Sequence, residues 1–321
     1  MLQPTSKSTA ALEDLLPIAP PHSAACDPSL PPDVVFDHLI RRHPCLGGPA
    51  HLRAGRMHLP VSPNCNIQCR FCHRQFDDRQ NRPGVSRRLL RPEECLDKVI
   101  RGRELCPEIT VVGIAGPGDP LASDHALTAF RQIHGRFPEL IKCMSTNGLM
   151  LARRAEEVVE AGVQTVTVTV NGVDPGIVQA ICTSVHWEGQ FYTGRAAAEI
   201  LLAQQMLGIR SMRARGVLVK INSVLIPGVN AHHMGAIARS VAQVGATLIN
   251  IIPLIPQHAL AHCPAPSCEQ LAGARAEAER YLPVFRHCRQ CRADACGILG
   301  GDQELSRLLY EEPQAATFSH G

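Results

Sequence analysis

Apolar positions along the middle of the chain follow two periods in alternation. Short apolar runs predict buried strands, and stretches with apolar residues at helical spacing predict the helices that connect them. The predicted strands are residues 57–61, 109–115, 140–144, 164–170, 217–222 and 247–252. The predicted helices are residues 91–103, 124–137, 151–161, 194–207, 231–244 and 269–282. Strands that alternate with helices in this way indicate parallel βαβ units, so we expect an α/β fold, a partial (βα)6 barrel of the TIM type.

The two ends of the chain lack this alternation. Residues 1–40 are rich in Pro, Ser and Ala with little periodicity, which predicts a disordered leader. Residues 41–260 contain the predicted barrel and a short segment before it, and residues 261–321 form a Cys-rich extension. Several predicted strands run directly into Gly, Asn or Ser, and ligands of parallel α/β folds bind at that edge.

Composition narrows the class of protein. A hydrophobic fraction of 45% supports a sizeable core, and a net charge of +3 is too small to indicate a nucleic-acid partner. No apolar run approaches the ~18 residues of a membrane span. Glu13, Asp14 and Pro17 interrupt any export signal, so we expect a cytoplasmic protein. Its 14 cysteines are many for a reducing compartment, where thiolates usually bind metal or carry out redox chemistry.

Three cysteines form the run Cys65-Asn-Ile-Gln-Cys69-Arg-Phe-Cys72, directly after the first predicted strand. Three thiolates on one loop can hold a cuboidal [4Fe-4S] cluster and leave its fourth iron open. A zinc site needs a fourth close ligand, and the adjacent His73 is badly placed to share the same metal. We therefore favour the cluster over zinc, with chance clustering of cysteines as the other alternative.

This run is the signature of the radical S-adenosylmethionine (SAM) superfamily, which the chain resembles. The resemblance implies that the three cysteines are catalytic, that the open iron binds the methionine moiety of SAM, and that an electron from the cluster cleaves SAM to a 5′-deoxyadenosyl radical. A ferredoxin or flavodoxin would supply that electron. The SAM-binding residues would be Phe71, Gly116, Gly118, Asp119, Ser145, Asn147, Asn171, Asn222 and Ser223. Each strand-end residue alone also fits a turn or cap, so only their joint position supports this prediction.

Longer motifs resemble one family within that superfamily, the NifB family of nitrogenase iron–molybdenum cofactor biosynthesis proteins. The motifs include His43-Pro-Cys45, Gly113-Ile-Ala-Gly-Pro-Gly-Asp-Pro120, Val224-x-Ile-Pro-Gly228 and His287-Cys-Arg-Gln-Cys-Arg-Ala-Asp-Ala295. The resemblance extends from about residue 40 to about residue 302. The chain resembles the short form of the family, which has no NifX-like domain.

The resemblance implies two further [4Fe-4S] clusters, which fuse into an eight-iron cluster with a carbide derived from SAM. One would be held by Cys45, His58 and Cys143, and the other by Cys288, Cys291 and a third ligand. Cys296 is the nearest candidate for that ligand, and Cys263 and Cys268 are alternatives. Without the resemblance, His58 fits a packed histidine, Cys143 a core cysteine, and the Cys288–Cys291 pair half a zinc site. Cluster donor proteins and downstream cofactor carriers or scaffolds are the implied partners.

One loop departs from the family pattern. It reads Cys72-His-Arg-Gln-Phe-Asp-Asp78, where the family usually has a further Cys at the position of Asp78 and a Glu shortly after it. Two other functions stay open on the sequence alone. One is a different radical SAM enzyme with auxiliary clusters, such as a methylase or a peptide-modifying enzyme. The other is a non-catalytic iron–sulfur carrier or scaffold.

Overall fold

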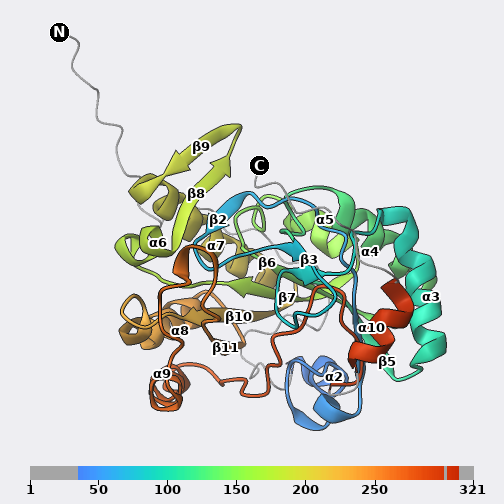
Figure 1. The fold of residues 1–321 in the computed structure, drawn as a ribbon. Helices are drawn as coiled ribbons and strands as arrows, with labels where there is room; N and C mark the ends of the chain where they lie inside the picture. Colours follow the sequence, from blue (N-terminus) through green and yellow to red (C-terminus); the bar gives the residue numbers. More distant parts are fainter. Residues whose placement is uncertain (1–34, 300–301, 311–321) are drawn as a thin grey trace.

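A curved seven-stranded sheet forms the centre of the computed structural model, which describes residues 35–299 and 302–310 (Figure 1). The strand order is β11-β10-β7-β6-β5-β1-β12. The parallel strands are β1 (Gly55–His58), β5 (Ile109–Ile114), β6 (Ile141–Thr146), β7 (Val163–Thr169), β10 (Leu218–Leu225) and β11 (Leu248–Pro253). These are the six strands predicted from the sequence, so the partial (βα)6 barrel is confirmed. The short strand β12 (Cys296–Gly297) adds to β1 in the antiparallel direction.

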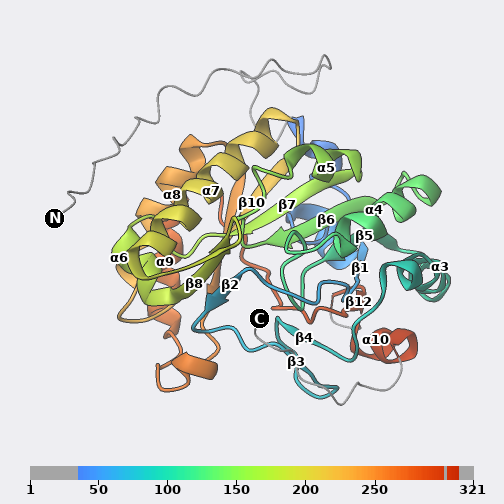
Figure 2. The same cartoon turned by 90° about the horizontal axis from the view of Figure 1, so that it is seen from above.

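Helices cover the convex face of the sheet, as Figure 2 shows. They are α3 (Cys95–Leu105), preceded by the turn η3 (Pro92–Glu94), α4 (His125–Arg136), α5 (Ala155–Glu160), α7 (Gly194–Ala214), α8 (Met234–Gln243), preceded by η4 (Ala231–His233), and α9 (Cys268–Glu279). Each corresponds to a predicted helix. The main hydrophobic core lies between them and the sheet, where strand residues such as Val112, Met144 and Val166 are fully buried.

The concave face of the sheet is lined in layers. At the amino ends of the strands the layer is apolar: Val111, Ile141, Leu218 and Leu248 pack together with Phe285. The next positions on this face are polar: His58, Cys143, Thr165, Lys220 and Asn250. At the carboxyl ends, Ser145, Thr169 and Asn222 line cavities. The layers lie an even number of residues apart along each strand, because only every second side chain of a strand points to the same face.

The segment before the barrel closes its amino end. Helix α2 (Asp37–Ile40) and the turn η2 (Gly48–Leu52) lie within or just after the predicted leader. Phe36 and Leu39 are buried in the apolar layer. The prediction of disorder up to residue 40 is therefore wrong at its end, because these two side chains bury apolar surface there. Residues 1–34 of the predicted leader lie outside the described residues.

Several elements were not predicted. Strand β2 (Ile67–Cys69) pairs with a hairpin of β8 (Cys182–Trp187) and β9 (Gln190–Thr193), which projects at the top of Figure 1. A two-stranded sheet of β3 (Gln75–Phe76) and β4 (Val85–Ser86) follows the cysteine run. Helix α6 (Pro175–Ile181) precedes the hairpin, and η5 (His258–Leu260) and α10 (Asp302–Tyr310) follow the barrel. The cysteine run thus contributes a strand to a sheet added to the barrel.

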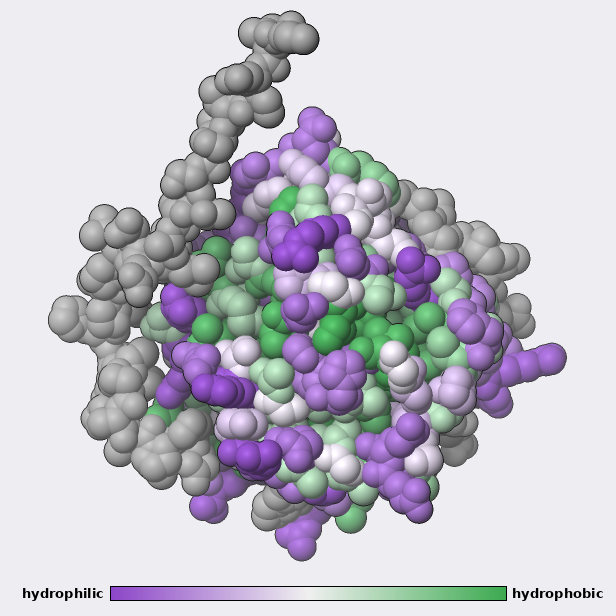
Figure 3. Space-filling view, turned by 90° about the vertical axis from the view of Figure 1, so that its left-hand side faces the viewer, coloured by the Kyte–Doolittle hydropathy of each residue, from purple (hydrophilic) through white to green (hydrophobic). Residues whose placement is uncertain are grey.

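The surface is mixed in polarity. Figure 3 shows polar residues spread over one face, with apolar residues gathered near its centre. Of the helices in the described ranges, none has the length and apolar content needed to cross a bilayer.

Candidate functional site

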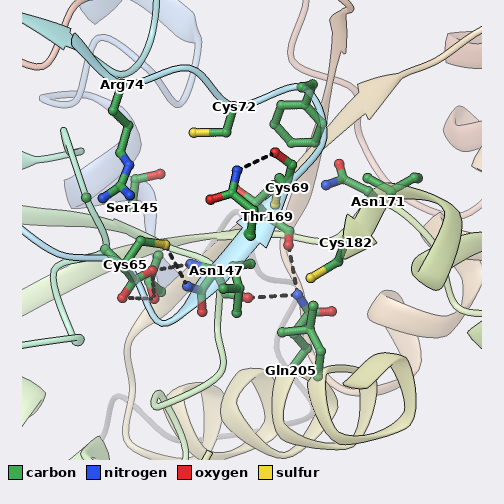
Figure 4. A pocket seen from close by; sticks show the side chains of 18 of the residues that line it. Cys65, Cys69, Cys72, Arg74, Ser145, Asn147, Thr169, Asn171, Cys182 and Gln205 are labelled. Atoms are coloured by element: carbon green, nitrogen blue, oxygen red, sulfur yellow. Dashed lines mark hydrogen bonds between the residues drawn. The ribbon is translucent and has the colours of Figure 1, made fainter. Parts of the chain in front are cut away.

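A cavity of about 160 Å³ lies at the carboxyl ends of the central strands. Cys65, Cys69 and Cys72 all line it, as Figure 4 shows. Apolar side chains from α6 and α7 form part of the wall, among them Ile181 and Leu201. The three predicted cluster ligands therefore line one cavity at the edge where ligands of parallel α/β folds bind.

The cysteine run is held by contacts to the strand ends. Asn147 follows β6, and its Nδ2 donates to Asn66 Oδ1 at 2.7 Å and to Cys65 Sγ at 3.7 Å. Burial raises the pKa of the Cys65 thiol to about 12 and also raises that of Cys72. These thiols are therefore protonated without metal, and a bound metal would displace the protons.

The Gly116–Pro120 loop packs tightly beside the run. A Cβ on Gly118 would lie 2.0 Å from the Asn64 carbonyl oxygen, so only glycine fits there. Asp119 is buried, and its carboxylate accepts hydrogen bonds from Asn147 N at 2.6 Å, Leu121 N at 2.9 Å and the Thr146 hydroxyl at 2.9 Å. Asp119 therefore braces two strand-end loops as well as lining the cavity.

The other predicted SAM-binding residues differ in whether they line the cavity. Phe71, Gly118, Ser145, Asn147 and Asn171 line the cavity, whereas Gly116 lies between two residues that do. Asn222 lines a second cavity of about 230 Å³, which shares Phe71 and Ser145 with the first. The prediction that Ser223 binds SAM is wrong. Ser223 is fully buried, and its hydroxyl donates a hydrogen bond to the Val170 carbonyl. Because side chains alternate along β10, Ser223 points away from the face that carries Asn222.

Six polar or thiol residues of the wall were not predicted as site residues from the sequence: Gln68, Arg74, Thr146, Thr169, Cys182 and Gln205. Gln205 is buried on α7, and its amide donates to the carbonyls of Asn147 at 2.7 Å and Thr169 at 2.9 Å. A glutamine among the apolar positions of a predicted helix was the available signal. No sequence signal indicated Cys182, because no nearby cysteine forms a motif with it.

A [4Fe-4S] cluster fits this donor set. Three half-buried cysteines come from one loop, and strand-end polar groups face the same cavity. Among the described residues, no three His, Cys, Asp or Glu side chains converge closely enough for a single metal ion. A cuboidal cluster binds its thiolates on separate irons, so it requires wider spacing than a single ion does.

A second group of possible ligands lies deeper in the barrel. His58, Gly113 and Cys143 are register neighbours on β1, β5 and β6. Gly113 lacks the Cβ that would lie 3.0 Å from the His58 ring, so the imidazole extends across it toward β6. His58 Nδ1 is fixed by the Arg292 carbonyl at 2.9 Å, which leaves Nε2 on the Gly113 side. The structure therefore brings His58 and Cys143 to one place.

Cys45 lies between this group and the Cys-rich extension. It is close enough to both Cys291 and Cys143 for their charges to interact, and its carbonyl accepts a hydrogen bond from Lys220 at 2.7 Å. Burial raises the pKa of the Cys45 thiol to about 12. Arg56 donates to Cys291 Sγ at 3.0 Å. Buried cations thus stand beside the thiols, where they would offset the charge of thiolates.

Proteins of known family are similar in sequence to most of this chain. The sequence profile of the radical SAM superfamily matches residues 59–241. The FeMo cofactor biosynthesis protein NifB of Methanocaldococcus infernus is 41% identical over 279 residues, which cover 86% of this chain and 92% of that protein. The protein of the same name from Klebsiella pneumoniae is 45% identical over 85% of this chain, but the match spans 60% of that protein. The chain belongs to the NifB family.

The fold has a solved counterpart within the superfamily. A radical SAM methyltransferase from Sphaerobacter thermophilus superimposes with a TM-score of 0.52, at 20% sequence identity over 74% of this chain and 69% of that one. At this identity the likeness concerns the fold alone.

For this NifB family member, the structure does not support Cys296 as the third ligand beside Cys288 and Cys291. Cys296 pairs with Met57 across β12 and β1, and paired residues point to the same face. That face is the main core, where both are fully buried. Cys288 packs instead against the apolar layer on the concave face. Cys296 is therefore a core cysteine, and its closeness to Cys291 in sequence was misleading.

The alternatives to Cys296 lie elsewhere. Cys268 is exposed at the start of α9, and Cys263 packs beside Phe71 and Leu260. Cys45 is close enough to Cys291 for their charges to interact, which makes it a further candidate for the third ligand.

The loop that departs from the NifB family pattern is well ordered by hydrogen bonds. Asp77 accepts from the backbone of Arg79 at 2.6 Å and Gln80 at 2.8 Å, and its carbonyl accepts from Arg292 at 2.7 Å. Asp78 stands at the position of the usual cysteine, with its side chain half exposed and 3.8 Å from Arg79. The chain therefore offers a carboxylate at the position where the resemblance to the family implies a thiolate.

Proposed function

We propose that this chain is a radical SAM enzyme of nitrogenase cofactor biosynthesis. Two [4Fe-4S] clusters are its substrates, and it fuses them into an eight-iron precursor whose carbide derives from the SAM methyl group. A ferredoxin or flavodoxin supplies electrons, donor proteins deliver the clusters, and a carrier or scaffold protein takes the product. The names of the relatives support a role in nitrogenase cofactor biosynthesis.

The observation that carries the proposal is the placement of a ligand group next to the SAM cavity. Cys143 precedes Ser145 by two residues on the same face of β6, and Ser145 lines the cavity. Two residues of strand span roughly 7 Å. A cluster bound by His58 and Cys143 would therefore lie within reach of chemistry in the cavity.

The residues of the cavity would prepare SAM for cleavage. When bound by Cys65, Cys69 and Cys72, the resident [4Fe-4S] cluster would supply the electron that breaks the S–C5′ bond. Ser145, Asn147 and Thr169 offer hydrogen bonds to the polar groups of SAM, and apolar residues of α6 and α7 exclude water. The second cavity adjoins the first and would leave room for a substrate beside SAM.

Anaerobic reconstitution tests the proposal. The protein loaded with iron and sulfide should hold about three [4Fe-4S] clusters and cleave SAM when reduced. Changing Cys65, Cys69 and Cys72 together to Ala should remove one cluster and all cleavage. The control Cys95→Ala alters a buried thiol on α3 that lines neither cavity, and it should retain both properties.

Isotope labelling tests the second half of the proposal. Carbon from the labelled methyl group of SAM should appear in the iron–sulfur product. Iron for only one cluster, or a product without the label, would contradict the proposed fusion reaction.

A further inference from the structure

Cys182 lies directly beside one of the three cluster cysteines. It begins β8 and is the register partner of Cys69 on β2, in an antiparallel pair. Partners in such a pair point to the same face. The two thiols lie close enough together to influence each other's protonation, and both line the SAM cavity (Figure 4).

The surroundings of Cys182 leave it few partners. The residue is 3% exposed and packs among apolar side chains that include Val178 and Leu201. Its sulfur also lies 3.3 Å from the Ser184 carbonyl, to which the S–H can donate. The thiol of Cys182 can therefore turn between the Ser184 carbonyl and the Cys69 sulfur.

Cys182 is badly placed to be a cluster ligand itself. A cuboidal cluster binds each thiolate on a different iron, which keeps ligand sulfurs farther apart than hydrogen-bonded neighbours. The contact with Cys69 instead suits a donor to a bound sulfur. Once Cys69 binds iron it has no proton and can only accept, so Cys182 holds the one S–H of the pair.

We propose that Cys182 is a positioning residue for the SAM-binding cluster. Its S–H donates to the iron-bound sulfur of Cys69, holds β2 and β8 together at the cavity, and stabilises the reduced state of the cluster. A hydrogen bond to a cluster sulfur favours the more negative, reduced form, so it raises the reduction potential. The inference rests on the proposed function, because it requires a cluster at Cys65, Cys69 and Cys72.

Redox titration of the full, reconstituted chain tests this role. The cluster in question is recognised as the component of the EPR spectrum that SAM perturbs. Cys182→Ala should shift its potential to a lower value, whereas Cys182→Ser retains a donor and should not. Cys95→Ala is the matched control, since Cys95 is also buried and contacts a backbone carbonyl, that of Arg91 at 3.5 Å. Its potential should equal that of the unchanged protein.

Pulsed EPR in heavy water measures hyperfine coupling between the cluster and exchangeable deuterons. This coupling should not depend on Cys182 if the residue only packs against its neighbours. The unchanged protein, without SAM, should show coupling to an exchangeable deuteron that Cys182→Ala lacks. If the Ala variant does not fold, Cys182→Val fills the apolar surroundings and serves the same comparison. Equal potentials and equal deuteron couplings overturn the inference and leave the proposed function intact. Absence of any SAM-perturbed signal in the unchanged protein overturns both.

Discussion

At the scale of single residues, the missing side chain of Gly113 shapes the deeper ligand group. It lets the His58 imidazole reach across β5 toward Cys143. Imidazole binds iron more weakly than thiolate and can leave as a neutral group. A substrate cluster that must later move and fuse benefits from one such releasable ligand.

We predict that His58→Ala still binds and cleaves SAM but loses or destabilises one substrate cluster. Cleavage depends on Cys65, Cys69 and Cys72, which the change leaves in place. His58→Cys should hold the cluster but release it poorly. Nitrogen hyperfine coupling to a reduced cluster, measured by pulsed EPR, should disappear in His58→Ala. If His58 only packs the strand, the variant instead loses about 1–3 kcal/mol of stability and keeps its iron content.

A second residue-scale prediction concerns His43, which precedes Cys45 by two positions. Its Nδ1 accepts from Cys45 N at 3.0 Å, and its buried Nε2 has no hydrogen-bond partner among the described residues. Burial lowers the pKa of His43 from 6.5 to about 3, with the charge of Lys220 as a smaller cause. The unfolded chain therefore binds one more proton than the folded chain between these two pH values.

The stability of the metal-free protein should consequently be highest above pH 6.5 and fall as the pH decreases. The slope from His43 is about 1.4 kcal/mol per pH unit. His43→Asn keeps an acceptor for the Cys45 N–H but does not titrate, so its unfolding free energy should depend less on pH. Denaturant unfolding at several pH values measures the difference in slope, and parallel curves would refute the assignment.

At the scale of elements, buried polar braces hold the strand-end loops in register. Asp119 connects the loop after β5 to the loop after β6 through three donors. We predict that Asp119→Asn costs about 1–3 kcal/mol and weakens SAM binding, because an NH2 group would face N–H and O–H donors. Asp78→Asn changes a half-exposed carboxylate and should cost less than about 0.5 kcal/mol. Urea unfolding compares the two variants, and equal losses would argue against the brace.

The barrel elements were predictable because their patterns are local. Buried parallel strands are short apolar runs, and their helices carry apolar stripes, so each could be read within its own segment. The β8–β9 hairpin was missed even though Glu188 and Gly189, both with positive φ, form its turn. The hairpin interrupts the barrel alternation between two predicted elements, and its partner β2 lies more than a hundred residues earlier.

The candidate site was predictable where one loop supplies it and not where separate elements meet. The spacing of Cys65, Cys69 and Cys72, on a loop directly after the first predicted strand, favoured a cluster. Ser223 and Cys296 failed because each lies on the wrong face of its strand, which sequence proximity does not reveal. The position of Cys182 beside Cys69 depends on the pairing of β8 with β2, which the sequence did not predict.

At the scale of the whole molecule, the proposed substrate-cluster ligands tie both ends of the described chain to the barrel. Cys45 lies before β1, and Cys288 and Cys291 lie after the last barrel strand. These two segments already touch, because the rings of His51 and His287 are 4.8 Å apart. Bound clusters would add covalent links between segments more than two hundred residues apart in sequence.

We therefore predict that iron loading protects the two ends more than the centre. Hydrogen exchange of residues 43–52 and 285–297 should slow on reconstitution, while β7 and β10, already buried in the sheet, should change little. The Cys65, Cys69 and Cys72 to Ala variant is the control, since it should lose protection at β2 yet keep it at both ends. Exchange at the ends that is unaffected by iron would contradict the ligand assignment of Cys45, Cys288 and Cys291, because a cluster held there cannot form without immobilising both segments.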